Sequence, residues 1–511
     1  MMENGFRGSL LNKNEFTVSL EIVAGRGSFE KAQENAVETA KWAGKDGRIS
    51  AVSITDSPGG RPGIDPAFMA EELKSYGAEP LIHYTLKDKN RLHIESELYG
   101  CARRGLNNLL IMTGDFPKKG YFPGNGKPVF DLDPVHTLEL IGAMNQGLAL
   151  PKGHRLKPAD FFAGCVVTPF KNVEAEIITE YIKLEKKIKA GADFIISQVG
   201  YDIRKFDELH RVCRSIDPKV PLIGNIFILD KRLAELIHLH LFTGCTIPEK
   251  LYRRIMSEEG DEKEAGLVRA AKMFAIMKGL GYDGVHLGGE DLTREDIDFV
   301  IERGTELADR WESLLTEFEG YDDGAFYYYR KNEENGLNSE VRNDLSSNAA
   351  DLRDPLKYKL LRKLHESVFE KEGFLSKSAS AFGRRSAKGK FCRNVEKALR
   401  AGILHCRDCG DCALPFTDFI CPMTQCPKEQ RNGPCGGSRN GYCELYPNKR
   451  PCIYVTAYDR LKARNRTDLL RVKVDPPSCS LYGTSELHNY FTGKDTYSKW
   501  KERNRDKNER S

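Results

Sequence analysis

The stretch KAGADFIISQV at residues 189–199 joins the end of an expected helix to a buried strand. A lysine-rich helical pattern ends there at Gly191, and glycine readily adopts the left-handed conformation that terminates a helix. The run DFIISQV follows, and a short, nearly continuous apolar run is typical of a strand buried on both faces. Such a helix and strand form the repeating unit of a parallel sheet.

The same unit recurs along the first part of the chain. Further apolar, β-branched runs lie at residues 17–23, 51–56, 80–86, 108–115, 161–168, 221–228 and 284–289, and helical patterns such as residues 28–43 separate most of them. Eight units in about 290 residues favour a barrel over an open doubly wound sheet, whose first strand would be followed by a stronger glycine-rich turn than EIVAGRG. We therefore predict an α/β fold, with a (β/α)8 TIM barrel at residues 1–315.

Polar side chains end seven of the eight predicted strands. In a parallel barrel the carboxyl ends of the strands meet on one face, where the chemistry of such folds is found. Each side chain taken alone could instead cap a helix or satisfy a turn. Together they predict one shared site, formed by Glu21, Thr55, His83, Asp115, Thr168, Gln198 and His286.

A second region is defined by cysteine. Of the 14 cysteines, eight lie between residues 406 and 452, beginning with the motif CRDCGDC. A disulfide framework or scattered core thiols are the alternatives, but the absence of a secretory signal favours a reduced, cytoplasmic chain in which thiolates bind metal. The compact C-x2-C-x2-C spacing favours iron-sulfur clusters, with 4Fe-4S expected, over zinc. The predicted ligands are Cys406, Cys409, Cys412, Cys421, Cys426, Cys435, Cys443 and Cys452.

Composition sets limits on other functions. The 511 residues are 40% hydrophobic and 30% charged, as in ordinary globular proteins, and the net charge of +4 gives no argument for nucleic acid. No apolar run of about 18 residues suggests a membrane span. Residues 316–390 are polar and predict a linker with one helical segment at 355–372, and residues 391–511 form the cysteine-rich domain with a basic tail.

Several motifs in residues 15–310 resemble the methylenetetrahydrofolate reductase family. They are FTVSLEI at the first strand, PLIHYTLKDKNR at the third, GLNNLLIMTGDFP at the fourth, KKIKAGADFIISQVGYD at the sixth, and FTGCTIP with GYDGVHL around the eighth. Two departures stand out: residues 22–25 replace the usual aromatic and proline residues, and VVTPF replaces a YPE-like motif at Thr168. The second departure leaves FAD and FMN both open.

The cysteine-rich region has a resemblance of its own. The motifs CRDCGDC, CPK, NGPCGG and the CE at Cys443 are similar to the small iron-sulfur or zinc partner subunit of acetogen-type reductases. Both halves lie on one chain here, so the resemblance implies a fused form. It also implies that electrons reach a flavin through this region, without NADH having to bind to the barrel.

The family resemblance also implies individual roles. Glu21 would donate the proton that opens the folate ring, as a carboxylic acid whose pKa is raised in a dry barrel mouth. Asp115 would tune flavin and folate and bind both, and Gln198 would bind the pterin. Capping by Glu21 or Asp115, and a structural amide at Gln198, are the alternatives. The implied flavin contacts are Thr55, His83, Asp115, Thr168, Glu180 and Lys187.

The sequence thus predicts a flavin-dependent reductase of 5,10-methylenetetrahydrofolate, acting reversibly in one-carbon metabolism. The expected partners are a folate substrate and an electron donor, namely ferredoxin, NAD(P)H or a dehydrogenase subunit, and an oligomer is expected. Two other classes stay open. A methyl-transfer or demethylation enzyme would use the same barrel without net reduction and would need no flavin, and a non-catalytic electron-transfer subunit would not depend on Glu21 or Asp115.

Overall fold

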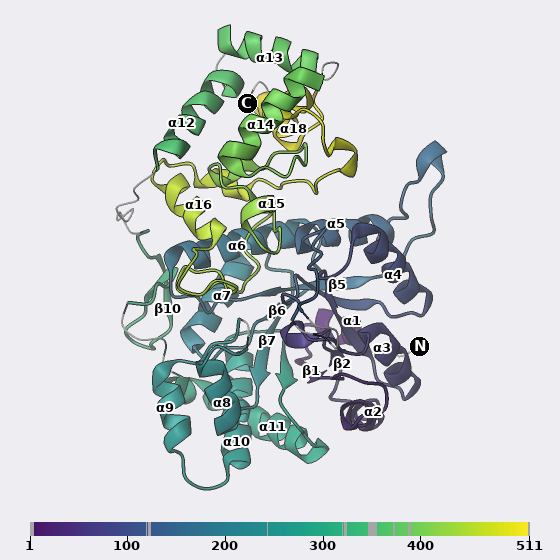
Figure 1. Cartoon of the computed structure of the whole chain (residues 1–511). Helices are drawn as coiled ribbons and strands as arrows, with labels where there is room; N and C mark the ends of the chain where they lie inside the picture. Colours follow the sequence, from purple (N-terminus) through teal and green to yellow (C-terminus); the bar gives the residue numbers. More distant parts are fainter. Residues whose placement is uncertain are drawn as a thin grey trace. The chain divides into compact units, whose positions relative to one another are not determined.

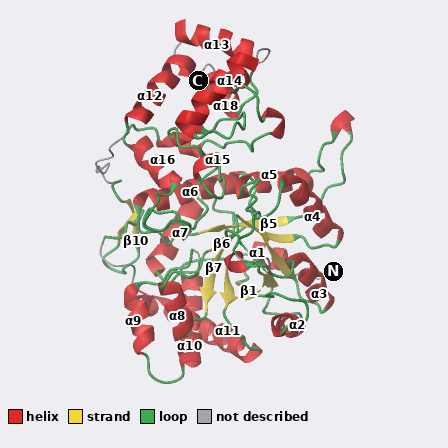
Figure 2. Ribbon diagram, viewed as in Figure 1, coloured by secondary structure: helices red, strands yellow, loops and turns green. Residues whose placement is uncertain are grey.

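The fold is that of a computed structural model, which describes residues 5–118, 120, 124–242, 244–318, 320, 324–345, 355–370, 374–386 and 390–508. The chain divides into two compact units. The barrel unit comprises Met1–Asp344 together with Cys435–Asn440, and the C-terminal unit comprises Leu345–Pro434 and Gly441–Ser511. Figure 1 traces the chain through both units, and Figure 2 shows the strands gathered in the barrel unit.

Eight parallel strands close into a barrel in sequence order, with β1 paired to β8, which confirms the predicted (β/α)8 TIM barrel. Each strand lies within the run that predicted it, because these runs are almost wholly apolar and buried on both faces. The strands are β1 (Thr17–Ile22), β2 (Ala51–Ile54), β3 (Pro80–Thr85), β4 (Asn108–Met112), β5 (Phe162–Val167), β6 (Ile195–Ser197), β7 (Leu222–Phe227) and β8 (Gly284–Gly288).

Helices follow the strands and cover the outside of the barrel (Figure 2). Their apolar faces join the outward side chains of the strands in one large core, which includes Val18, Leu20 and Val285. They are α2 (Lys31–Ala43), α3 (Pro66–Ser75), α4 (Arg91–Arg103), α5 (Pro134–Asn145), α6 (Glu174–Lys189), α7 (Ile203–Ile216), α8 (Lys231–His238), α9 (Glu249–Ser257), α10 (Glu262–Gly279) and α11 (Arg294–Leu307).

A short N-terminal helix, α1 (Phe6–Leu11), lies in a stretch that the sequence presented only as a polar lead. Phe6 and Leu10, four residues apart, share one helix face and are fully buried. They form a second apolar cluster with side chains that point into the barrel, and the Phe6 ring packs edge-on at 5.3 Å from that of Phe194. The other members are Ala51, Leu81, Leu110, Phe162, Ile196 and Ile223. This cluster fills the barrel on the side where the strands begin.

Residues 316–390 contain more regular structure than their polar composition predicts. The hairpin β9 (Tyr329–Lys331) and β10 (Asn338–Arg342) belongs to the barrel unit, where Asn338 Nδ2 donates 2.8 Å hydrogen bonds to Asp207 Oδ2 and to the Arg204 carbonyl. Tertiary hydrogen bonds of this kind are invisible to composition. The predicted helical segment is present as α12 (Leu356–His365), and the stretch FLSKSASAFGRRS, predicted as linker, forms α13 (Phe374–Ser386).

The C-terminal unit consists of helices and loops throughout its described residues. Its centre is aromatic, with Phe416 packed edge-on against Tyr497 at 5.7 Å and Phe369 against Tyr490 at 4.6 Å. The remaining helices are α14 (Lys390–Leu404), α15 (Pro422–Gln425), α16 (Ile453–Lys462), α17 (Glu486–Phe491) and α18 (Thr496–Asn508). None of the helices that the structure describes, in either unit, is both long and apolar enough to cross a membrane.

Candidate active site and cysteine-lined cavity

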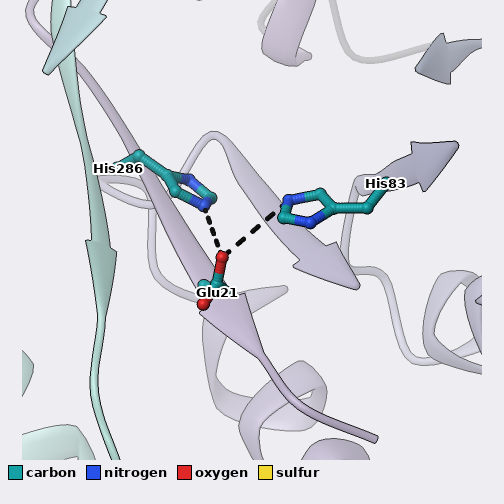
Figure 3. Close-up of side chains that lie close together, drawn as sticks. All are labelled: Glu21, His83 and His286. Atoms are coloured by element: carbon teal, nitrogen blue, oxygen red, sulfur yellow. Dashed lines mark ion pairs between the residues drawn. The ribbon is translucent and has the colours of Figure 1, made fainter. Parts of the chain in front are cut away.

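Glu21 lies at the carboxyl end of β1 and meets two histidines from other strands. Its Oε2 atom is 3.5 Å from Nε2 of His286 on β8 and 4.0 Å from Nε2 of His83 on β3. Figure 3 shows the two rings approaching the carboxylate from two sides. The Glu21 side chain is 19% exposed, whereas that of His286 is only 1% exposed. The structure therefore brings together three of the predicted strand-end residues, with Glu21 as the member that faces solvent.

Each histidine ring also contacts a serine, His286 through the nitrogen remote from Glu21 and His83 through the nitrogen nearest to it. Ser19 Oγ lies 2.8 Å from His286 Nδ1, and Ser53 Oγ lies 2.6 Å from His83 Nε2. Ser19 precedes Glu21 by two residues, so both side chains point into the barrel. Sequence reasoning missed both serines, because a serine inside an apolar strand carries no distinctive signal.

The electrostatics of Glu21 differ from the sequence-based expectation. Burial by itself would raise the pKa of Glu21, but the His286 imidazole and the nearby charges of His83 and His286 together lower that pKa below its ordinary value. Burial lowers the pKa of His83 to about 4, although the negative charge of Glu21 opposes this effect. The expectation of a raised Glu21 pKa was wrong because the two histidines could not be placed beside it from sequence.

Asp115 and Gln198 follow other strands of the same barrel face. Asp115 Oδ2 accepts a 2.7 Å hydrogen bond from the backbone N–H of Gly59, which fixes the carboxylate against the loop after β2. Gln198 Oε1 accepts a 2.9 Å hydrogen bond from the N–H of Val199, and Cys245 Sγ lies 4.0 Å from it. Gln198 is thus partly engaged by its own backbone, as the structural alternative predicted.

Cys245 is a member of this face that sequence reasoning passed over. Burial raises the pKa of its thiol to about 12, and the negative charges of Glu21 and Asp115 act in the same direction. Both carboxylates are therefore close enough to act on one sulfur, which links the ends of β1 and β4. A single cysteine in FTGCTIP gave no signal by which it could have been selected.

The remaining predicted flavin contacts divide into two groups. Thr55, buried at the end of β2, has a hydroxyl Oγ1 with no hydrogen-bond partner among the described residues. On the other side of the barrel, Thr168 Oγ1 and Glu180 Oε1 are also buried without a partner there. Lys187 Nζ donates a 2.5 Å hydrogen bond to the Val166 carbonyl. Unsatisfied buried polar atoms are uncommon and need an explanation, such as a ligand.

The segment Cys435–Asn440, which belongs to the barrel unit, lies against this second group. Lys171 Nζ donates hydrogen bonds to the carbonyls of Ser438 and Gly436, the latter at 2.6 Å. A Cβ added to Gly436 would lie 3.4 Å from Thr168 Cγ2 and 3.7 Å from Glu180 Oε1. Burial raises the pKa of Glu180 although the nearby lysines oppose it. Sequence reasoning did not identify Lys171, which interacts with a segment 265 residues away.

Four of the predicted cysteine ligands line one cavity in the C-terminal unit. These are Cys406, Cys409, Cys412 and Cys421, and Arg400 also lines the cavity. Cys406 Sγ lies 3.4 Å from Arg400 Nη2 and 3.3 Å from the backbone nitrogen of Asp408, so a cation and an N–H both face this sulfur. Such donors stabilise a thiolate, the form that binds metal.

The other four predicted ligands lie outside that cavity lining. Burial raises the pKa of Cys426, and the charge of Cys443 adds to this effect, so these two sulfurs are near each other. Cys452 precedes the first turn of α16, and Cys435 belongs to the barrel unit. The structure therefore groups the first four cysteines and pairs two of the rest.

Comparison with known proteins agrees with this architecture. A family model described as "Methylenetetrahydrofolate reductase" matches residues 7–296, and one described as "Methylene-tetrahydrofolate reductase C terminal" matches residues 386–480. The chain is 22% identical over 286 residues to methylenetetrahydrofolate reductase 2 of Schizosaccharomyces pombe, covering 52% of this chain and 42% of that protein. It is 23% identical over 215 residues to 5,10-methylenetetrahydrofolate reductase of Salmonella typhimurium, covering 41% of this chain and 64% of that protein. The matched region thus spans less than two thirds of either relative.

Proposed function

Because the chain belongs to the methylenetetrahydrofolate reductase family, we propose that it reduces the methylene bridge of 5,10-methylenetetrahydrofolate to the methyl group of 5-methyltetrahydrofolate, reversibly. The observation that carries the proposal is Glu21 in the barrel mouth, 3.5 Å from His286 and 4.0 Å from His83. A partly exposed carboxyl group backed by two buried imidazoles is suited to exchanging a proton with a bound ligand.

The chemistry explains why such a group is needed. The bridging carbon is bonded to two nitrogens, so one C–N bond has to break before hydride can reach the carbon. A proton from Glu21 to the leaving nitrogen would assist this step, and the cationic iminium that results would be favoured by the negative charge of Asp115. Gln198, with a donor and an acceptor in one plane, would bind the pterin edge.

A bound flavin, FAD or FMN, would supply the hydride. The unpartnered hydroxyl of Thr55 fits a polar group of such a cofactor, and His83 and Asp115 would border the same position at the barrel mouth. Thr168, Glu180 and Lys187 would extend the flavin site toward α6. The unpartnered oxygens of Thr168 and Glu180 support this extension, and Gly436 has room for no more than an ordinary contact between a Cβ and these two side chains.

We further propose that the cysteine-rich region binds iron-sulfur clusters, expected to be 4Fe-4S, and passes electrons toward the flavin. The cavity lined by Cys406, Cys409, Cys412 and Cys421 supports a four-thiolate site, and Cys426, Cys435, Cys443 and Cys452 are the remaining predicted ligands. Electrons would come from ferredoxin, NAD(P)H or a dehydrogenase subunit. With zinc in place of iron the region would be structural, and a nicotinamide donor would act at the barrel.

Anaerobic purification with a visible spectrum and analysis for flavin, iron, acid-labile sulfide and zinc tests these assignments. Flavin with iron and sulfide is expected. Zinc with flavin would contradict electron entry through clusters and leave the reductase intact. A protein that neither retains nor binds flavin would contradict the reductase and favour methyl transfer without net reduction.

The role of Glu21 is tested by Glu21→Gln in the flavin-loaded protein. We expect the flavin spectrum to be retained and folate reduction to fall by about 100-fold or more, because the amide cannot release a proton. Glu38→Gln is the matched control, since Glu38 pairs with Lys41 on the outer surface of α2. Undiminished turnover in Glu21→Gln would remove Glu21 from the mechanism.

A further inference from the structure

His286 combines deep burial with a ring nitrogen that lacks a hydrogen bond. Its side chain is 1% exposed, and Nε2 has no hydrogen-bond partner among the described residues, although it lies 3.5 Å from Glu21 Oε2. A buried polar atom without a partner costs about 1–3 kcal/mol, so this arrangement requires a reason. The Glu21 carboxylate, which this nitrogen faces, can account for the arrangement.

Strand register places a serine beside one ring nitrogen of His286. The pairing of β1 with β8 places Ser19 directly beside His286, and Ser19 Oγ donates a hydrogen bond to the Val285 carbonyl at 3.5 Å. If Ser19 Oγ accepts the hydrogen of His286 Nδ1, 2.8 Å away, the serine hydrogen is left to point toward the Val285 carbonyl. The neutral ring then carries its hydrogen on Nδ1 and presents the lone pair of Nε2 to Glu21. Two acceptors face each other stably only when a proton lies between them.

We propose that Glu21 and His286 hold one proton in common, and that His286 is a positioning residue that keeps this proton available to Glu21 at neutral pH. The inference deepens the proposed function and its catalytic part rests on it. As the C–N bond of the folate bridge breaks, the shared proton passes from Glu21 to the leaving nitrogen, and the pair is left without a proton. One proton from solvent then restores the pair through Glu21, which is the exposed member. The hydride and its two electrons come from the reduced flavin and take no part in this exchange.

The charged groups around the pair determine how firmly it holds its proton. His83 approaches Glu21 from the β3 side, with its Nε2 bonded to Ser53 Oγ, and Asp56 acts on His83 from the end of β2. The negative charges of Asp115 and Glu21 both act on the Cys245 thiol. The pair is neutral while it holds the proton and negative without it, so the negative carboxylates of Asp56 and Asp115 oppose loss of the proton. If one proton is shared, its gain or loss belongs to the pair and not to either residue alone.

The first test needs no activity. In the purified full chain with isotope-labelled histidine rings, the His286 signals are assigned by their loss in His286→Gln and followed by NMR as a function of pH. We expect Glu21→Gln to shift the His286 titration by about one pH unit or more, because a shared proton couples the two groups. His210→Gln is the matched control, since His210 stacks on Tyr282 at 5.9 Å and is no neighbour of Glu21. An unchanged His286 titration, or one metal ion bound per chain that His286→Gln abolishes, would overturn the proposal.

The second test measures reduction in a single turnover. Flavin-loaded protein is reduced chemically without its natural donor, mixed with methylenetetrahydrofolate, and followed by flavin absorbance over a range of pH. In His286→Gln the loss of rate on the alkaline side should move at least about one pH unit lower, since Glu21 alone must then hold the proton. Ser19→Ala removes the hydroxyl beside Nδ1 of His286, so both tautomers of the ring become accessible. The alkaline loss of rate should then move to lower pH as well, but by less than in His286→Gln. A uniform loss of rate with an unmoved pH profile would mean a merely structural histidine.

The two tests separate failure of this inference from failure of the proposed function. If no flavin binds, the reductase assignment fails, while the NMR coupling between Glu21 and His286 still stands or falls by itself. If the folate reoxidises the flavin but Glu21→Gln leaves the His286 titration unchanged, the reductase assignment stands and the shared proton is excluded.

Discussion

Lys171 reaches across 265 residues of sequence to donate a 2.6 Å hydrogen bond to the carbonyl of Gly436. The lysine is buried, with 4% of its surface exposed, and its second bond goes to Ser438. Hydrogen bonds from a charged donor contribute about 1.5–3 kcal/mol each, so this side chain helps to hold the segment Cys435–Asn440 in place.

Replacing Lys171 by Met should therefore release that segment while keeping most of the side-chain volume. Hydrogen exchange of the amides of residues 436–440 in the full chain should rise by about tenfold or more, because their local opening becomes easier. Lys189→Met is the control, since Lys189 is 70% exposed and pairs with Glu185 on its own helix. Unchanged exchange in Lys171→Met would show that other contacts hold the segment.

Gly410, between two of the cavity cysteines, should not tolerate a side chain. Its φ of +72° is unfavourable for other residues, and an added Cβ would lie 2.0 Å from the Leu481 carbonyl oxygen. We expect Gly410→Ala to destabilise the C-terminal unit by about 2 kcal/mol or more. Gly402→Ala in α14 is the matched control, where nothing lies within 4 Å and a gain of about 0.5–1 kcal/mol is expected. Denaturant unfolding followed by Trp500 fluorescence compares them, and equal midpoints would contradict the prediction.

The C-terminal unit should lose stability in mild acid because of His365. Burial lowers the pKa of His365 to about 4, with the charges of Lys501 and Arg466 acting in the same direction. Between the ordinary histidine pKa of 6.5 and this value the unfolded chain binds more protons than the folded one. The free energy of unfolding therefore falls as pH is lowered through that interval, by about 3 kcal/mol at most.

His365→Gln keeps a donor for the Tyr497 hydroxyl, which lies 3.1 Å from His365 Nε2, but cannot take up a proton. Its unfolding midpoint should depend less on pH than that of the unmodified chain, as measured by denaturant titration at several pH values. His93→Gln, at an exposed position in α4, should leave the dependence as it was. A dependence equally steep in His365→Gln would assign the acid sensitivity to other groups.

Cysteine substitutions should distinguish metal ligands from cysteines that bind no metal. Cys409 is buried in the lining of the cavity, whereas Cys479 is exposed and lies outside the eight predicted ligands. We expect anaerobically prepared Cys409→Ser to lose about half of the bound metal, as one of two four-ligand sites fails, and Cys479→Ser to keep all of it. Full metal content in Cys409→Ser would remove it from the ligand set.

Much of the barrel could be predicted because its strands are apolar on both faces, and such runs stand out between helical patterns. Glu21, His83 and His286 could be selected as well, because the carboxyl ends of parallel barrel strands meet on one face, where the site was expected. What the sequence could not supply is the partner of each group. Ser19 and Ser53 are ordinary strand residues until the register places them beside histidines. The two histidines lower the pKa of Glu21, which burial alone would raise.

The elements that sequence missed depend on distant contacts. Helix α1 has only six residues, too few for a periodic pattern, and is stabilised by the aromatic rings that it meets inside the barrel. In the sequence, Lys171 looks like any other polar residue. Its role follows only from the structure, where Cys435–Asn440 lies against it. Composition reports the average character of a segment, whereas these positions are determined by single partners far away in the sequence.

Helix α1 also gives the interior of the barrel an apolar end. Phe6, Leu10 and the side chains around them form an apolar layer where the strands begin, and Ser19, Ser53 and the two histidines lie nearer the carboxyl ends of the strands. The side chain of Glu21, 19% exposed, is more accessible to solvent than either histidine. A ligand bound beside Glu21 would therefore cover the most accessible member of the group and slow proton exchange between the histidines and bulk solvent for as long as it stays bound.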